Sequence, residues 1–346
     1  MNPPLDRRSF LGQSLAGLAA ASPAISTLAQ DAPAKPLRLG LVSAASYGAG
    51  GEPRKSGSNH GTAFATVFNG FDEEKAKAFQ GTFVRAGRRL EGAKVVKIWD
   101  PDKAAAAALA DACGIETVTD TPGQCSDGVD AVLLIDDGSG AQWKYAEASL
   151  RKGIPTFCDK PLAMTAKEAA AIAKIARETG TKFMSASSLR FVPDIVKLKS
   201  ELAELGPVHL ATAVCGNELV YYGIHALSMI YSVFGPGAVS AINVGKPGTN
   251  IARIRFTDDR EVVLMVADRE RMRGGYQINL YGEKGWRTLT PDLKDLYSYL
   301  LEAFLDYVRT GKESVPIEEE VEVIAALEAA KRSLELGREV TLAEVM

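Results

Sequence analysis

Lys160 is the residue best placed for chemistry in this sequence. It follows Thr156-Phe157-Cys158, which is typical of a short buried strand behind a Gly/Pro turn, and Pro161 biases it toward extended backbone angles. Thr165 and Glu168 then form a capping box that opens a helix. Ligands of open parallel sheets bind outside the carboxyl ends of the strands, so an ammonium group there could bind a ligand oxygen or exchange a proton with it. The alternative is a solvated loop lysine.

His225 is the second candidate for proton transfer. It lies in the first turn of a helix predicted to begin within Tyr221-Tyr222-Gly223 and to carry an apolar stripe as far as Phe234. A helix N-terminus favours the neutral imidazole, which can accept or donate a proton near neutral pH. A purely structural histidine is the alternative. The other histidines, His60 and His209, have no spacing that suggests a metal site, and we expect none.

Two successive patterns of strands and helices must position these residues. Up to about residue 190, apolar strands alternate with helices, which predicts a doubly wound parallel sheet. After Phe191 the strands follow one another, with a hairpin turn at 257–260, and two helices close the chain; this predicts a mostly antiparallel sheet. The expected strands are 37–44, 93–100, 129–135, 156–158 and 182–186, then 208–214, 239–244, 251–256, 262–267, 277–281 and 286–289; the expected helices include 103–113, 166–179, 292–307 and 317–336.

Several short motifs, taken in their order, resemble one enzyme family. Asp159-Lys160-Pro161 is similar to the Glu-Lys-Pro signature of the Gfo/Idh/MocA oxidoreductases, with Asp159 in place of the usual Glu. The segments 187–191, 223–225 and 311–340 continue the resemblance, which covers most of the chain from about Leu37. It implies an α/β fold with a dinucleotide-binding Rossmann domain over 37–190 and an α+β domain over 191–346. The second domain would bind substrate and form a dimer or tetramer through its open sheet.

The resemblance also implies roles for individual residues. Lys160 would take the proton of a substrate hydroxyl or polarise its oxygen, and His225 would face the substrate. Arg190, Tyr221 and Tyr222 are the expected substrate contacts. Tyr221 stands where the family usually has Asp, and Ser228 where a second Asp is common, so either the substrate differs or part of the proton relay is missing.

The expected dinucleotide site lacks its usual glycine fingerprint. Gly48 and Gly50 are correctly spaced, but Pro53 occupies the third position and has no N–H group. The long connection 45–60 is either a surface insertion or a displaced turn, in which the N–H groups near Asn59 hold the pyrophosphate. An acid such as Asp100 bonds ribose hydroxyls and repels a 2′-phosphate, which favours NAD over NADP; the alternative is a turn-forming residue. The expected cofactor-binding residues are Ser43, Asn59, His60, Asp100, Asp136, Asp137 and Lys160.

Composition limits the partners. With 346 residues, 46% hydrophobic and 24% charged residues, a net charge of −3 and a pI near 5.8, the chain is an ordinary globular sequence without the basic stripe of a nucleic-acid binder. Cys113, Cys125, Cys158 and Cys215 have no paired metal-ligand spacing; an oxidising compartment would permit a disulfide, but the sequence does not demand one.

The first thirty residues follow an export pattern. Asp6-Arg7-Arg8-Ser9-Phe10-Leu11-Gly12 is a twin-arginine motif, and an Ala/Gly-rich apolar segment and a cleavage site at 27–29 follow it. We expect a signal peptide over 1–30, a linker over 31–36, no membrane span in the mature protein and a periplasmic location.

Three functional hypotheses result. The first is a periplasmic NAD(P)-dependent oxidoreductase that transfers a hydride between a tightly bound nicotinamide cofactor and a CH–OH group of a sugar, polyol or derivative. The second is elimination or glycoside cleavage driven by transient oxidation. The third is a non-catalytic sugar-binding protein that has lost its cofactor.

Overall fold

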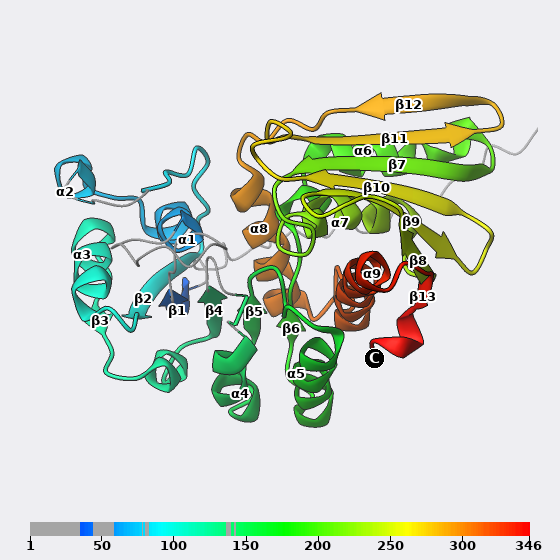
Figure 1. The fold of residues 1–346 in the computed structure, drawn as a ribbon. Helices are drawn as coiled ribbons and strands as arrows, with labels where there is room; N and C mark the ends of the chain where they lie inside the picture. The colour runs from blue at the N-terminus through cyan, green and yellow to red at the C-terminus, as the bar shows by residue number, and fades with distance from the viewer. Residues whose placement is uncertain (1–34, 44–58, 78, 80–82, 136–139, 142) are drawn as a thin grey trace, which may run out of the picture. The chain divides into compact units, whose positions relative to one another are not determined.

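A computed structural model describes residues 35–43, 59–77, 79, 83–135, 140–141 and 143–346 (Figure 1). The expected signal peptide and linker, Asp136 and Asp137 lie outside the described residues, and so does most of the connection that follows the first strand. Residues 35–346 form one compact unit. Among the described helices, none is long and apolar enough to cross a bilayer.

The first sheet is parallel throughout and has strand order β3-β2-β1-β4-β5-β6. β1 pairs with β2 on one side and with β4 on the other, so the strand order reverses between β1 and β4. In open α/β sheets that reversal opens a crevice at the carboxyl ends of the strands. The strands are β1 (Leu37–Ser43), β2 (Ala93–Trp99), β3 (Thr117–Val118), β4 (Ala131–Ile135), β5 (Thr156–Cys158) and β6 (Phe183–Met184).

Helices cover both faces of this sheet because its strands are apolar on both. On β4, Leu133 and Ile135 pack in one cluster with residues of α1, α3 and α8, whereas Val132 and Leu134 pack in another with residues of α4 and α5. This alternation follows the two-residue repeat of a strand. The helices of this half are α1 (Asn59–Asn69), α2 (Glu73–Lys77), α3 (Lys103–Cys113), α4 (Trp143–Arg151) and α5 (Ala166–Thr179), with the 3₁₀ turns η1 (Pro122–Ser126) and η2 (Ser188–Arg190).

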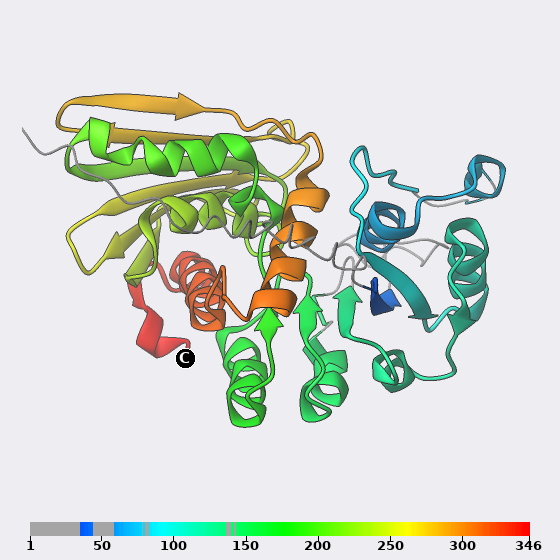
Figure 2. The same cartoon turned by 180° about the vertical axis from the view of Figure 1, so that it is seen from behind.

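The second sheet has strand order β12-β11-β7-β10-β9-β8-β13 and is antiparallel except between β7 and β10. Figure 1 shows α6 and α7 behind its strands, and the reverse view in Figure 2 shows these helices in front, so they cover the same face. The strands are β7 (Val208–Gly216), β8 (Ala238–Asn243), β9 (Thr249–Phe256), β10 (Glu261–Ala267), β11 (Tyr276–Gly282), β12 (Gly285–Leu289) and β13 (Val340–Thr341).

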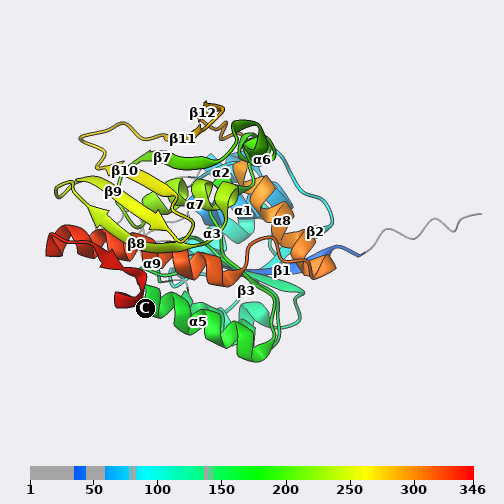
Figure 3. The ribbon, with the colours of Figure 1, turned by 90° about the vertical axis from the view of Figure 1, so that its right-hand side faces the viewer.

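Two helices of this half are central to the packing. α7 (Gly223–Phe234) is buried along almost its whole length, as its high apolar content requires. α9 (Ile317–Leu336) lies between β8 and α5, as the side view in Figure 3 shows. The remaining helices are α6 (Pro193–Ser200) and α8 (Leu296–Thr310), with the 3₁₀ turns η3 (Leu202–Leu205) and η4 (Leu342–Glu344).

The predicted fold class is confirmed, and the differences are local. β4 begins at Ala131 rather than at 129, and α8 begins at Leu296 rather than at 292, after Asp295 in a left-handed conformation (φ 57°). At the predicted capping box, Thr165 Oγ1 accepts the N–H of Glu168 at 3.3 Å. The Glu168 carboxylate, however, accepts the hydroxyl of Thr165 at 2.9 Å and not its backbone N–H.

Candidate active site

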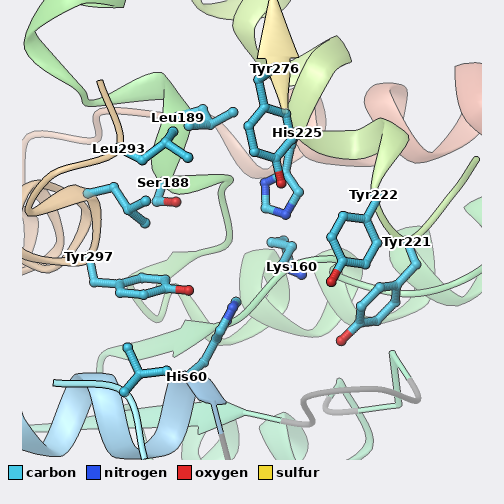
Figure 4. A pocket seen from close by; sticks show the side chains of 12 residues that line it. His60, Lys160, Ser188, Leu189, Tyr221, Tyr222, His225, Tyr276, Leu293 and Tyr297 are labelled. Carbon is cyan, nitrogen blue, oxygen red and sulfur yellow. The ribbon is translucent and has the colours of Figure 1, made fainter. Parts of the chain in front are cut away.

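A cavity of about 370 Å³ lies where the carboxyl end of β5 meets α1, α7 and α8. Figure 4 shows Lys160 near its centre, with His225 and His60 on opposite sides and the tyrosines around them. The two predicted catalytic residues therefore meet in one cavity, although 64 residues of sequence separate them. The lining consists of His60, Val84, Lys160, Ser188, Leu189, Tyr221, Tyr222, His225, Tyr276, Leu293, Leu296 and Tyr297.

Lys160 follows β5 and is only 3% exposed. Its Nζ lies 4.4 Å from the centre of the Tyr221 ring and 5.7 Å from that of Tyr222. Aromatic faces attract a desolvated ammonium group by about 2 kcal/mol. Within the described part of the chain no carboxylate forms an ion pair with Lys160. Tyr221 and Tyr222, predicted as substrate contacts, thus line the cavity and also hold the lysine.

His225 lies in the first turn of α7, and Ser187 fixes its ring. Ser187 Oγ and His225 Nδ1 are 2.8 Å apart. Because Ser187 Oγ already accepts the N–H of Leu189 at 3.3 Å, its hydroxyl hydrogen can be donated to Nδ1. Burial lowers the pKa of His225 well below its usual value, and the charges of Lys160 and His60 lower it further. His225 is therefore a neutral imidazole, and the Ser187 hydroxyl can pair with its Nδ1 in either tautomer.

His60, one of the expected cofactor-binding residues, lines the same cavity as Lys160 and His225. Its Nδ1 is 2.5 Å from Oδ2 of Asp159, the residue before Lys160, and its ring centre is 5.0 Å from that of Tyr297. A carboxylate on Nδ1 orients an imidazole and stabilises its charged form. The cavity thus holds a second imidazole with its own carboxylate.

The described residues fit a nicotinamide dinucleotide at the expected sheet edge. Ser43 ends β1 and is buried, and the backbone of α1 begins at Asn59, which presents a helix N-terminus toward this edge. Asp100 follows β2, is buried, and accepts the N–H of Asp102 at 2.8 Å, so it forms the turn that was the alternative prediction. A carboxylate at this strand end is also the group that binds ribose hydroxyls, and the two roles are compatible.

Arg190 does not line the cavity. Its guanidinium is buried against α9, where it forms ion pairs with Glu319 and, at 3.4 Å, with Glu320. Burying a guanidinium requires such partners, and these two carboxylates provide them. This placement does not support the expected substrate contact, and it makes Arg190 a residue that joins the two halves of the chain.

Several residues that complete the cavity were not among the predicted site residues. Ser187 follows β6 as part of a predicted family segment, but only the fold brings it to His225. Tyr297 comes from α8, whose sequence pattern shows only an amphipathic helix, and Tyr276 begins β11. Their roles depend on tertiary contacts, which a local pattern does not contain.

Among the described residues no three His, Cys, Asp or Glu side chains gather into a metal-binding group. The four cysteines are buried thiols, and burial raises the pKa of Cys113 and of Cys215 to about 12. Neither feature assigns further chemistry to the cavity.

Comparison with known proteins agrees with the fold and the motifs. Residues 68–187 match the model of an oxidoreductase family with an NAD-binding Rossmann fold, GFO_IDH_MocA. Inositol 2-dehydrogenase 4 of Saccharopolyspora erythraea is 32% identical over 122 residues, which are 34% of this chain and 36% of the relative. D-xylose 1-dehydrogenase (NADP(+)) 2 of Haloferax volcanii is 26% identical over 295 residues, which are 70% of this chain and 90% of the relative. The chain thus spans about a third of the length of the first relative and most of the second.

A solved structure extends the likeness to the whole fold. Scyllo-inositol dehydrogenase from Lactobacillus casei, solved with bound NAD(H) and scyllo-inositol, superimposes with a TM-score of 0.69 at 15% identity, over 89% of this chain and 100% of that one. The family model and the names of the relatives agree with the predicted oxidoreductase class and with NAD or NADP as cofactor. Residues 68–187, about a third of the chain, are thus similar to the Gfo/Idh/MocA oxidoreductases.

Proposed function

We propose that this protein is an NAD(P)-dependent oxidoreductase acting on a CH–OH group of a sugar, a polyol or a derivative of these. The observation that carries the proposal is the meeting of Lys160 and His225 in one cavity at the carboxyl edge of the parallel sheet. Relatives named as inositol and xylose dehydrogenases support the substrate class.

Lys160 and His225 have different roles at the substrate oxygen. A nicotinamide dinucleotide, when bound, supplies the acceptor or donor of the hydride. Lys160 binds the reacting hydroxyl and takes or returns its proton, a contribution of about 10²–10⁴-fold in rate. His225 is neutral, so in the Nε2–H tautomer it donates that hydrogen to the same oxygen or to a neighbouring hydroxyl without repelling Lys160. Tyr221 and Tyr222 hold the ammonium group over the cavity.

The first test asks whether the protein retains a dinucleotide. A chain that matures outside the pool of free dinucleotide must keep its cofactor bound and alternate between two substrates. We expect the purified protein to release NAD or NADP when it is denatured, as measured by mass spectrometry of the supernatant. Protein that neither releases nor binds a dinucleotide would favour the non-catalytic sugar-binding alternative.

The second test removes the proposed proton acceptor. Lys160→Met should lower turnover per bound dinucleotide about 10²–10⁴-fold. Turnover is followed by nicotinamide absorbance over a panel of sugars and polyols. Lys174→Met is the matched control because Lys174 is an exposed lysine of α5, paired only with Glu178 at 3.7 Å. If both variants turned over substrate like the parent, the assigned role of Lys160 would be wrong.

Elimination or glycoside cleavage is the second candidate. Simple alcohol oxidation needs one proton acceptor, but His60 with Asp159 adds another acid–base pair to the same cavity. A pair of this kind could move the proton on carbon that elimination requires. This reaction would consume substrate without net reduction of the dinucleotide, and product analysis with simultaneous absorbance measurement distinguishes the two.

We also propose that a second copy of this chain covers the open face of the second sheet. The face opposite α6 and α7 carries Leu210, Tyr281 and Trp286 in paired register, and Ile251 two strands from β7. All four side chains are exposed, and Trp286 is 72% exposed. An apolar row of this kind on a sheet is typical of a subunit interface.

We propose further that residues 1–30 direct export by the twin-arginine route and that the mature protein is periplasmic. The support is the Arg7-Arg8 motif and the apolar segment that follows it. When the full-length gene is expressed and the cells are fractionated, the processed protein should be found in the periplasm. An Arg7→Lys/Arg8→Lys variant should remain in the cytoplasm, and an unchanged distribution would exclude this route.

A further inference from the structure

A second hollow of about 370 Å³ adjoins the catalytic cavity. The two share Tyr222 and Tyr276, and the far wall is built by Asn217, Arg269, Arg273 and the backbone of the β10–β11 loop at 274–275. We name this hollow the arginine pocket. A ligand that reacts at Lys160 and extends past these two tyrosines would place its distal end in this second hollow.

Arg269 is held against the shared wall. Its Nη2 donates to the hydroxyl of Tyr222 at 3.1 Å, and its guanidinium centre lies 5.7 Å from the centre of that ring. The hydroxyl occupies one of the five N–H donors of a guanidinium group, and the rest of the planar fork remains for another acceptor.

The backbone fixes the loop that carries Arg273. A Cβ atom at Gly216, the last residue of β7, would lie 3.0 Å from the carbonyl oxygen of Arg273 and 3.0 Å from Cα of Gly274. The loop thus passes directly over the end of β7, and a side chain at 216 would displace it slightly. This close approach keeps Arg273 in the wall of the pocket although its side chain is exposed.

Neither arginine is neutralised within the part of the chain that the structure describes. On the same sheet, Arg253, Arg255 and Arg287 lie 3.6, 3.5 and 3.0 Å from carboxylates. Arg269 and Arg273 form no such ion pair with any described residue. The nearby Glu218 is engaged elsewhere, since its carboxylate accepts the backbone N–H of Tyr221.

The linings of the two hollows together carry a net positive charge. Their described linings contain Lys160, Arg269 and Arg273 as cations, and no aspartate or glutamate. The phosphates of a dinucleotide bind at the carboxyl end of β1 in this type of sheet, whereas both arginines come from the second sheet. Binding of the cofactor phosphates therefore does not explain the positive charge of the arginine pocket.

We propose that the arginine pocket binds an oxyanion of the substrate, so that the substrate is a sugar or polyol bearing a carboxylate or phosphate group away from the reacting carbon. This inference rests on the proposed function and narrows its substrate class. Guanidinium forks bind carboxylate and phosphate oxygens in pairs, which both anchors the group and orients the molecule. The anchored end would place the opposite end of the substrate beside Lys160 and His225.

Isothermal titration calorimetry with the dinucleotide-containing protein tests the proposal. The ligands form matched sets: D-glucose with D-glucuronate and D-glucose 6-phosphate, D-galactose with D-galacturonate and D-galactose 6-phosphate, and myo-inositol with its monophosphates. We expect at least one anion to bind about tenfold or more tightly than its neutral parent, and the advantage to shrink as salt is added. Preference for the acid or for the phosphate identifies the oxyanion.

Variants of one loop provide the control. Arg269→Gln and Arg273→Gln should each lower the affinity for the anion about tenfold and leave that for the neutral parent unchanged. Arg271→Gln removes the same charge from the same loop, but Arg271 donates to Thr249 at 3.2 Å and does not line the pocket, so it should bind the anion like the parent. Equal losses of anion affinity in Arg269→Gln and Arg271→Gln would show that the effect comes from the overall charge of the protein and not from the pocket. That result would overturn the proposal. So would a panel in which no anion binds more tightly than its neutral parent.

The two proposals fail separately. A protein that oxidises glucose or inositol and ignores their anions refutes the oxyanion pocket and leaves the oxidoreductase intact. A protein that binds glucuronate through Arg269 but holds no dinucleotide refutes the oxidoreductase and leaves the pocket.

Discussion

Glu320 is a carboxyl group with no exposed surface, in the first turn of α9. Burial raises its pKa to about 7; Arg190, 3.4 Å away, opposes this shift, and the charge of Glu319 adds to it. In the folded protein Glu320 therefore holds a proton at pH values where the unfolded chain has lost it. The free energy of unfolding must fall as pH rises from about 4.5 to about 7, because the folded state binds the extra proton in that range.

Glu320→Gln should remove this dependence. At pH 5 the variant and the parent should have similar free energies of unfolding, and at pH 8 the variant should be more stable by up to about 3 kcal/mol, since each pKa unit corresponds to about 1.4 kcal/mol. Urea unfolding at both pH values measures the difference. Glu318→Gln, at an exposed neighbour paired with Arg177, is the control. Stability curves of Glu320→Gln and parent that run parallel with pH would contradict the assignment.

Individual site residues could be predicted from the sequence where they stand in a short motif. They could not be predicted where their role depends on a tertiary contact. Lys160 and His225 could be identified because each stands in a short pattern at the start or end of an element. Arg190 also stands in such a pattern, but α9 supplies two carboxylates that bind it, and no local pattern reveals a partner 129 residues away. His60 was assigned to the dinucleotide, and its contact with Asp159 became evident only in three dimensions.

Among the elements, α9 carries a contact that joins two others. Oε1 of Glu322 accepts the hydroxyl of Tyr231 at 2.8 Å and the N–H groups of Gly237 and Ala238 at 2.6 and 2.7 Å. One carboxylate oxygen thus connects α7 to the start of β8. Hydrogen bonds to a charged group each contribute about 1.5–3 kcal/mol, and a buried donor left without its partner costs a similar amount.

Glu322→Ala should therefore lower the free energy of unfolding by about 3 kcal/mol or more. Chemical denaturation followed by circular dichroism measures it. Glu335→Ala removes an exposed glutamate from the same helix and should change stability by less than about 0.5 kcal/mol. A loss in Glu322→Ala as small as that of the control would show that the three hydrogen bonds contribute little.

Element boundaries were predictable where local signals define them. α9 begins after Pro316 and ends before Gly337, which has a φ of 65°, and its predicted span 317–336 is the observed one. The two-residue strands β3 and β13 were not predicted, because pairing with β2 and β8 creates them and their own sequences are too short to form a pattern.

For the whole molecule, the proposed interface on the second sheet predicts an assembly that a single charge can disrupt. Trp286→Glu should shift the protein toward monomer in sedimentation velocity, because a carboxylate would be buried between two sheets. Val196→Glu is the matched control: Val196 is 53% exposed, but it lies on α6, on the helix-covered side. A parent protein that sediments as a monomer at all concentrations would refute the interface.

The sequence could also predict the two-sheet architecture, because the change from alternating strands and helices to consecutive strands extends over the whole chain. It did not show that the halves share elements. Leu300, Leu301 and Phe304 of α8 pack in the same cluster as Phe64 of α1 and Phe157 of β5. The Phe157 ring lies 5.6 Å from that of Phe304 and 5.8 Å from that of Phe64.

This packing of α8 limits where the chain can be truncated or recombined with a homologue. A fragment ending near residue 190 would expose the side of the parallel sheet that α8 covers, and Phe157 would face water. Chimeras that exchange the substrate half between homologues would join one protein's α8 to another protein's sheet, so mismatched side chains would meet at Phe157 and beside Tyr297 in the catalytic cavity. A chimera that takes its substrate half from a homologue should therefore keep α8 from the same parent as the first half of the chain. This requires crossovers on both sides of residues 296–310.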